Sequence, residues 1–165
     1  MTEDPEFRRE RMTDPSAQLL RPIIHQWVTA DVVNFEAFKL STADKKDSNR
    51  LSIARGAATS AEQAYRDRAD AVRRRCEDNG RPYIAPVGVL GLDLSEVESV
   101  EIKSPSGDSS RQPLTVWDDS MNSSRPDDHG HIDYNELPPS DKGAYTLVAK
   151  TLVARAQKNG WKYKP

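Results

Sequence analysis

The stretch LSIARGAATSAEQAYRDRADAVRRRC (51–76) contains the clearest change from strand to helix in the chain. A short apolar run over 51–54 predicts a strand that ends at an Arg-Gly pair. Thr59 and Glu62 have the T-x-x-E spacing of a capping box, in which the two side chains satisfy free backbone N–H groups at a helix start. The stretch therefore predicts a strand, a tight turn and a helix over about 60–78.

Two helices are predicted to pack through apolar faces. Gly80 and Pro82 supply a stop for the first helix. A second helix is predicted over about 141–158, with Ser140 as its N-cap and Gly160 at its end. Apolar residues recur at helical spacing in both, at Tyr65, Ala69, Val72 and Cys76 and at Tyr145, Val148, Ala149, Leu152 and Ala156.

Short strand candidates surround the two helices. They are the extended segment 19–27 and the runs 83–92, 100–102, 114–117 and 131–134. Helices and strands in mixed order indicate the α+β class. We expect a single small domain over 16–165, with a short-stranded mixed or antiparallel sheet, and a flexible polar tail over 1–15.

Composition excludes several classes of protein. The chain has 165 residues, of which 36% are hydrophobic and 30% charged, and no apolar run is long enough to span a bilayer. The N-terminus lacks the apolar segment of a secretory signal, so we expect a soluble cytoplasmic protein. A single cysteine, Cys76, cannot form an internal disulfide, and its place on a helix face indicates a core residue.

The net charge of −2 hides a segregated distribution. Residues 104–141 hold eight acids and two arginines, a net of −6, whereas residues 142–165 hold six bases and no acid, a net of +6. The two segments can fold back and neutralise each other. Alternatively, the basic segment forms a docking surface for nucleic acid or an acidic partner.

A metal site is one hypothesis for the segment RPDDHGHIDY (125–134). If it forms a strand, His129, His131 and Asp133 point the same way, because side chains alternate along a strand. Imidazole and carboxylate groups on one face can bind a divalent metal, with Asp127 and Asp128 close by. The alternative is a polar loop that leads into an edge strand.

Two segments are candidates for binding an anion. Arg21 and His25 interrupt an apolar run and must find partners or an opening to solvent. Arg55, Thr59 and Ser60 lie where a strand leads into a helix, and free N–H groups at a helix start attract anions. The alternatives are a histidine that bonds to a backbone carbonyl in the core and a hydroxyl that only caps the helix.

The C-terminal helix and tail carry a third kind of candidate surface. Aromatic and cationic residues alternate in GWKYKP (160–165), a pattern that can stack bases and neutralise phosphates. The alternative is that the aromatic rings pack onto the domain while the lysines stay solvated. The candidate residues for nucleic acid or a partner are Lys150, Arg155, Lys158, Trp161, Lys162 and Lys164.

Some of these patterns resemble known proteins. The strings D-x-x-x-LS-x-x-RG-x-x-TSAE-x-AY and A-x-x-x-G-W-x-Y resemble a family of small bacterial proteins of no known activity, some of them carried on mobile elements. The likeness covers most of residues 20–163. It implies no chemistry.

A second likeness is architectural. The order of a strand over 51–54, a Thr/Ser turn, an alanine-rich helix and a strand over 87–92 resembles ADP-ribosyltransferase-like NAD-binding domains. That resemblance implies that Ser52 and either Arg21 or His25 cradle NAD and that Glu136 does the chemistry. The chain lacks the Q/E-x-E motif of that family.

No complete catalytic motif is present: G-x-S-x-G, P-loop, G-x-G-x-x-G and H-E-x-x-H patterns are all missing. We therefore expect first a small bacterial interaction or accessory protein, of immunity or regulatory type, that binds a protein partner through its charge-polarised C-terminal third, with no cofactor and no membrane. The alternatives are an NAD- or nucleotide-binding enzyme, or a nucleic-acid binder. A divalent metal is the other cofactor alternative.

Overall fold

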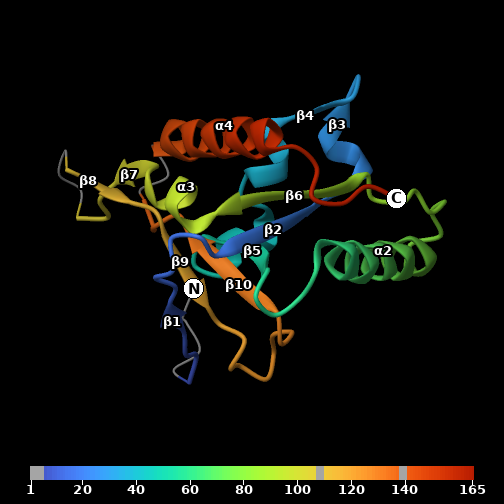
Figure 1. Ribbon diagram of the computed structural model, residues 1–165, viewed down its shortest axis with the longest axis horizontal. Coiled ribbons are helices and arrows are strands. Elements are labelled where there is room, and N and C mark those ends of the chain that lie inside the picture. Colours follow the sequence, from blue (N-terminus) through green and yellow to red (C-terminus); the bar gives the residue numbers. More distant parts are fainter. Residues whose placement is uncertain (1–5, 107–109, 138–140) are drawn as a thin grey trace.

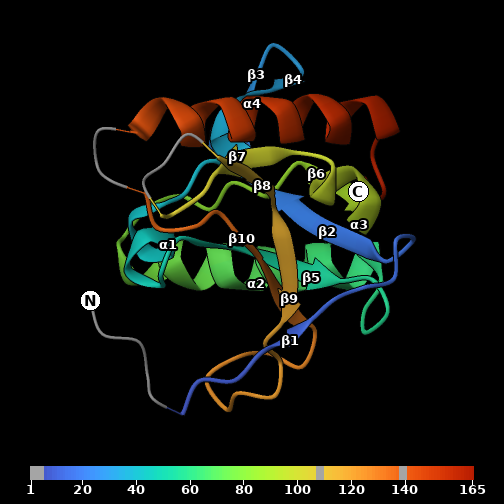
Figure 2. The same cartoon turned by 90° about the vertical axis from the view of Figure 1, so that its left-hand side faces the viewer.

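Two 18-residue helices, α2 (Ala61–Asp78) and α4 (Lys142–Asn159), lie on opposite faces of one antiparallel sheet (Figure 1, Figure 2). The computed structural model describes residues 6–106, 110–137 and 141–165. The predicted class, a small α+β domain with an antiparallel sheet and two main helices, is confirmed.

The central sheet has six strands. In spatial order they are β1 (Glu10–Arg11), β9 (Thr115–Asp118), β10 (His129–Asp133), β5 (Arg50–Arg55), β2 (Gln18–Ile23) and β6 (Gly88–Asp93). Two ribbons, β3 (Val28–Thr29) with β4 (Val32–Val33) and β7 (Glu101–Lys103) with β8 (Arg111–Pro113), flank it. Short helices are η1 (His25–Trp27), η2 (Phe35–Phe38), α1 (Thr42–Lys46) and α3 (Leu94–Glu98).

Each face of the sheet has its own apolar cluster. Along β2, Leu19 belongs to the large cluster with α4, while Leu20 belongs to a small cluster with α2. This alternation follows from the two-residue period of a strand. The small cluster is completed by Ala64, Tyr65, Ala69 and Val89. Helix α2 contacts β2 and β6, so this cluster lies under that half of the sheet.

The helix ends agree closely with the sequence pattern. Ser60, one residue after the predicted Thr59, caps α2 by accepting a 3.1 Å hydrogen bond from the backbone N–H of Gln63. Gly160 ends α4 with a φ of +79°, which glycine adopts without strain. The predicted cap at Ser140 lies outside the described residues.

The polar segment 41–50 contains a short helix. Ser41 and Asp44 form the capping box of α1, and the turn before β5 has positive φ at Ser48 and Asn49. A capping box also starts α3, where it joins Asp93 to Glu96. Polar residues alone did not distinguish a capped helical turn from a loop.

The segment predicted as a flexible tail is anchored to the sheet from Phe7 onward. Glu10 and Arg11 pair with β9 as the edge strand β1. The guanidinium of Arg9 lies 3.9 Å from the centre of the Trp117 ring and forms an ion pair of 2.9 Å with Asp133. These contacts hold residues 6–15 against the domain.

The C-terminal tail lies along the outer strand β6. The Lys162 N–H donates to the Val89 carbonyl at 2.8 Å, and the Val89 N–H donates to the Tyr163 carbonyl at 2.9 Å. Trp161 packs against the large core, and the Tyr163 ring centre lies 5.2 Å from that of Tyr65. The tail therefore covers an edge that would otherwise expose unpaired backbone groups.

None of the helices in the described segments is long and apolar enough to cross a lipid bilayer.

A substitution at Gly88 tests how closely the tail approaches β6. A Cβ added there would lie 2.6 Å from the Tyr163 carbonyl oxygen and 2.8 Å from the Trp161 ring. We expect Gly88→Ala to lower the free energy of unfolding, measured in urea, by about 1–3 kcal/mol, because overpacking forces neighbours to shift. Gly143→Ala is the matched control: nothing lies within 4 Å of its added Cβ, and the helix gains a better helix former. Equal effects of the two changes would contradict this arrangement.

Candidate functional site

Ser52, His129 and Asp119 form a continuous hydrogen-bonded chain. The His129 Nε2 lies 3.1 Å from the Ser52 Oγ, and the His129 Nδ1 lies 2.6 Å from the Asp119 Oδ1. Asp119 is fully buried, whereas Ser52 and His129 are half-buried. A hydroxyl, an imidazole and a carboxylate in this order form the relay that activates a nucleophile.

Strand pairing brings these side chains together. His131 faces Ser52 across the β10–β5 pair, and His129 faces Ala54. The two-residue period then puts Ser52, His129 and His131 on the same face, as the sequence pattern predicts for the histidines. Asp119 follows the last residue of β9 and so reaches the same face from the neighbouring strand.

The second histidine shares the Asp119 carboxylate. Its Nδ1 lies 2.8 Å from the Asp119 Oδ2, and its Nε2 lies 3.0 Å from an Nη1 of Arg9. Because a guanidinium can only donate, the His131 Nε2 accepts and its proton sits on Nδ1. Burial lowers the pKa of His131, and its bond to Asp119 only partly opposes that effect. His131 is therefore neutral in the folded protein.

Asp119 is ionised in spite of its burial. Burial raises its pKa, but the hydrogen bonds that it accepts from His129 and His131 outweigh that effect and hold the pKa well below its usual value. A carboxylate only accepts hydrogen bonds, so the proton of a neutral His129 sits on Nδ1. The free lone pair on Nε2 then faces the Ser52 hydroxyl.

A pocket of about 440 Å³ opens beside the hydrogen-bonded residues Ser52 and His129, between α2 and the sheet. Strand β2 pairs with β6 along its whole length but with β5 only at Leu19 and Leu20, so β2 and β5 are unpaired beyond that point. The pocket lies where they part. Its lining residues are Arg21, Pro22, Trp27, Ser52, Ile53, Ala54, Ala64, Asp67, Arg68, Asp70, Ala71, Arg74, Pro126, Asp128 and His129.

Arg21 fills the gap between the two strands. Its Nη1 donates to the Ser52 carbonyl at 2.7 Å, its Nε donates to the Ala37 carbonyl at 2.9 Å, and its guanidinium lies 5.0 Å from the Trp27 ring centre. Burial lowers the pKa of Arg21 to about 10, so it keeps its charge near neutral pH. The structure thus brings together Arg21 and Ser52, two of the residues predicted from the sequence.

The other predicted members of this region lie apart. His25 is exposed on η1, and Glu136 is exposed beyond β10; neither lines the pocket. Arg55 instead holds the loop before β10, donating to the carbonyls of His129 at 3.1 Å and Asp127 at 2.7 Å. The catalytic role that the ADP-ribosyltransferase likeness implies for Glu136 therefore has no counterpart at this pocket.

Thr59 and Ser60, the candidates for an anion site at a helix start, make hydrogen bonds within the chain. Ser60 caps α2, as described above, and the Thr59 hydroxyl points to the Ser60 carbonyl at 3.5 Å.

The residues of the metal hypothesis also make contacts within the chain. His129 and His131 converge on Asp119, while Asp133 pairs with Arg9. Among the described residues, no group of three His, Cys, Asp or Glu side chains is placed to hold a metal ion.

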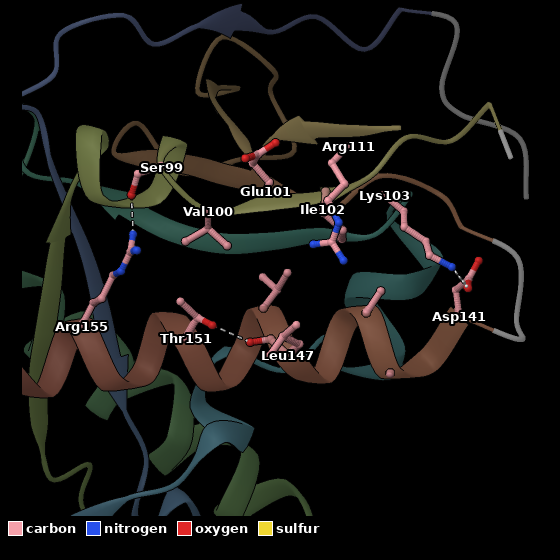
Figure 3. A pocket seen from close by; sticks show the side chains of 13 residues that line it. Ser99, Val100, Glu101, Ile102, Lys103, Arg111, Asp141, Leu147, Thr151 and Arg155 are labelled. Carbon is pink, nitrogen blue, oxygen red and sulfur yellow. Dashed lines mark hydrogen bonds and ion pairs between the residues drawn. The ribbon is translucent and has the colours of Figure 1, made fainter. Parts of the chain in front are cut away.

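A larger pocket, of about 580 Å³, lies between α4 and β7 (Figure 3). Its polar groups mostly satisfy one another: Lys103 forms an ion pair of 2.8 Å with Asp141, and Arg155 donates to Ser99 and to a carbonyl of α3. Its lining includes no histidine and no cysteine. The smaller pocket is therefore the better candidate for chemistry.

The basic C-terminal residues are spread along α4 and the tail. Lys150 lies 5.5 Å from the Phe35 ring centre and Lys164 lies 5.3 Å from the Trp161 ring centre, while Lys158 and Lys162 are exposed. Across the described segments, no ion pair joins a base after residue 141 to an acid of 104–141. The acids pair instead with residues elsewhere, such as Arg9, Arg55 and Lys103.

Comparison with known proteins gives no relatives to guide the assignment. No family model matches the chain, and no curated protein or solved structure is significantly similar to it. A functional proposal therefore rests on the geometry of the residues around the pocket.

Asp119 is the functional residue that the sequence pattern missed. It is one of eight acids in 104–141 and lies just beyond the predicted strand over 114–117. An acid at a strand end, next to a strand with alternating histidines, is the only signal for it. That signal becomes specific only when the pairing of β9 with β10 is known.

The neutral state of His131 predicts how stability depends on pH. Its pKa is lowered on folding, so the unfolded chain binds the proton more readily, and stability is lost as the pH falls below the unfolded value of about 6.5. We expect the free energy of unfolding to decrease from about pH 7.5 to about pH 5, above the range where carboxylates titrate. His131→Asn should flatten this slope, and His25→Asn, at an exposed site, should keep it. Parallel profiles for His131→Asn and the wild type would contradict the assignment.

Proposed function

We propose that this chain is an enzyme that cleaves an ester or amide through a covalent acyl intermediate on Ser52. The observation that carries the proposal is the Ser52–His129–Asp119 hydrogen-bonded chain on the wall of a pocket. Buried carboxylates need partners, and this one is oriented by two histidines, one of which faces a hydroxyl that lines an open pocket.

The proposed reaction has two steps. The Ser52 Oγ attacks the carbonyl carbon of the substrate while its proton passes to the His129 Nε2. The bond to the leaving group then breaks, and His129 gives the proton to that group. In the second step His129 takes a proton from a water molecule, which attacks the acyl carbon; the bond between that carbon and the Ser52 Oγ breaks, His129 returns the proton to Oγ, and the acid is released.

Asp119 acts in both steps through His129. Its carboxylate fixes the imidazole tautomer and stabilises the imidazolium that forms when His129 takes the proton. His131 and Arg9 hold the other carboxylate oxygen and its surroundings in place, so they are positioning residues.

A fluorophosphonate probe tests the nucleophile directly. Such probes phosphorylate activated serines with loss of fluoride, and mass spectrometry locates the adduct. We expect the adduct on Ser52, loss of labelling in Ser52→Ala, and a labelling rate lower by about 10²-fold or more in His129→Gln, because a general base contributes at least that much. Wild-type protein that does not react would overturn the proposal.

Ser99→Ala is the matched control. Ser99 is an exposed serine that lines the larger pocket and accepts a hydrogen bond from Arg155, but it has no histidine partner. It should label as the wild type does. Circular dichroism and thermal unfolding of each variant separate a lost nucleophile from a lost fold.

A second proposal is that the basic C-terminal region binds an acidic macromolecule. Lys158 and Lys162 are exposed and have no acidic partner within the described chain. Trp161 and Tyr163 pack onto the domain, so the lysines and not the rings would make the contact. An acidic protein partner and a cytoplasmic location remain our predictions, with nucleic acid as the alternative partner.

Salt dependence tests nucleic acid as that partner. We expect the affinity for a fluorescent DNA duplex to fall with salt, and Lys158→Glu with Lys162→Glu to reduce the slope of log K against log salt by about 2. The double control Lys45→Glu and Lys46→Glu, on exposed residues of α1, should leave the slope unchanged. Absent or salt-independent binding would leave an acidic protein as the only partner of this surface.

A further inference from the structure

The Arg21 guanidinium has no ion-pair partner within the described residues, and the charge of Asp44 offsets it only in part. It donates to the backbone carbonyls of Ala37 and Ser52, and no carboxylate of the described chain lies within ion-pair distance of it. Carbonyl oxygens satisfy N–H groups but supply no negative charge. A charge removed from water in this way is costly unless a counter-ion is supplied.

A second guanidinium faces the same pocket from α2. Arg68 is half-buried, and within the described residues its side chain makes no hydrogen bond or ion pair. Burial lowers the pKa of both arginines, and the charge of Arg68 lowers the pKa of Arg21 further, while the charge of Asp44 opposes both shifts in part. The two cations are therefore close enough to repel each other, and one anion between them would relieve both.

Among the described residues, the acids that line the pocket form no ion pair with Arg21 or Arg68. Asp70 pairs with Arg73 at 3.2 Å, and Asp67 accepts a hydrogen bond of 2.8 Å from the Gln63 amide, both on the exposed surface of α2. Asp128 lies at the start of β10, near His129. The half-buried cations thus lie on the inner part of the pocket, and the two helix acids lie at its exposed edge.

We propose that the substrate of this pocket carries a phosphate monoester group, which binds between Arg21 and Arg68 while the scissile carbonyl lies at Ser52. A phosphate dianion matches two guanidinium charges, and its tetrahedral oxygens accept two planar N–H pairs at once, whereas one carboxylate accepts one. Trp27, stacked near Arg21, adds an aromatic wall. The inference depends on the proposed function for calling the ligand a substrate.

Calorimetric titration with inorganic phosphate, at constant ionic strength and near pH 7.5, tests the anion site. We expect binding that is weakened at least about tenfold in Arg68→Gln, since each lost charge-assisted contact is worth about 1.5–3 kcal/mol. Arg66→Gln is the matched control, because Arg66 is exposed on the same helix and, among the described residues, pairs only with Glu62. Arg21→Gln should weaken binding similarly, and Arg68→Gln keeps the test valid if Arg21→Gln does not fold.

The outcomes separate this inference from the proposed function. Fluorophosphonate labelling of Ser52 without phosphate binding overturns the phosphate site and leaves the serine enzyme. Phosphate binding that depends on Arg68, without labelling, leaves an anion-binding pocket and overturns the enzyme. Acetate or succinate that binds as tightly as phosphate, or phosphate binding that is equal in Arg68→Gln and Arg66→Gln, also overturns the phosphate proposal.

Discussion

The buried carboxylate of Asp119 is the constraint around which this half of the molecule is organised. A charge with no exposure to water must be matched by donors, and here two imidazoles from one strand supply them. The histidines are matched in turn by Ser52 on one side and Arg9 on the other. A single buried charge thus ties β5, β9, β10 and the N-terminal segment into one polar network, and it sets the tautomer of the residue that faces the pocket.

The helices explain why this network can exist. Helix α4 and η2 cover one face of the sheet with a continuous apolar core, whereas α2 contacts mainly β2 and β6 on the other face. On that face the remaining strands carry mostly polar side chains, among them Arg50, Ser52, His129 and His131. The parting of β2 from β5 then leaves space next to Ser52, which Arg21 only partly fills.

The acidic and basic segments of the sequence differ in how their charges are paired. Four acids of 104–141, namely Asp118, Asp119, Asp133 and Asp141, pair with Arg55, Arg125, Arg9 and Lys103 and with the two histidines, so these four do not neutralise the basic helix. The bases that follow stay at the surface or lie against aromatic rings. The near-neutral total therefore combines an acidic segment that is partly paired within the chain with an exposed basic one. This division supports partner binding as a second proposed function beside the pocket.

The sequence by itself determined the α+β class, the two long helices with their ends at Gly80 and Gly160, and the common direction of His129 and His131. These features depend on local spacing: helical and strand periods, capping residues and glycine turns. It also singled out Arg21, because a charged group in an apolar run needs a partner, and the likeness to ADP-ribosyltransferase-like domains singled out Ser52. Only the tertiary structure decided that Asp119 contacts both histidines and that His25 and Glu136 lie outside the pocket. It also decided that Arg9, in the segment expected to be a flexible tail, contacts His131. The Asp119 contacts join residues 10 and 12 positions apart, and the Arg9 contacts join residues 122 and 124 positions apart. Strand order, which no local pattern encodes, sets which of them meet.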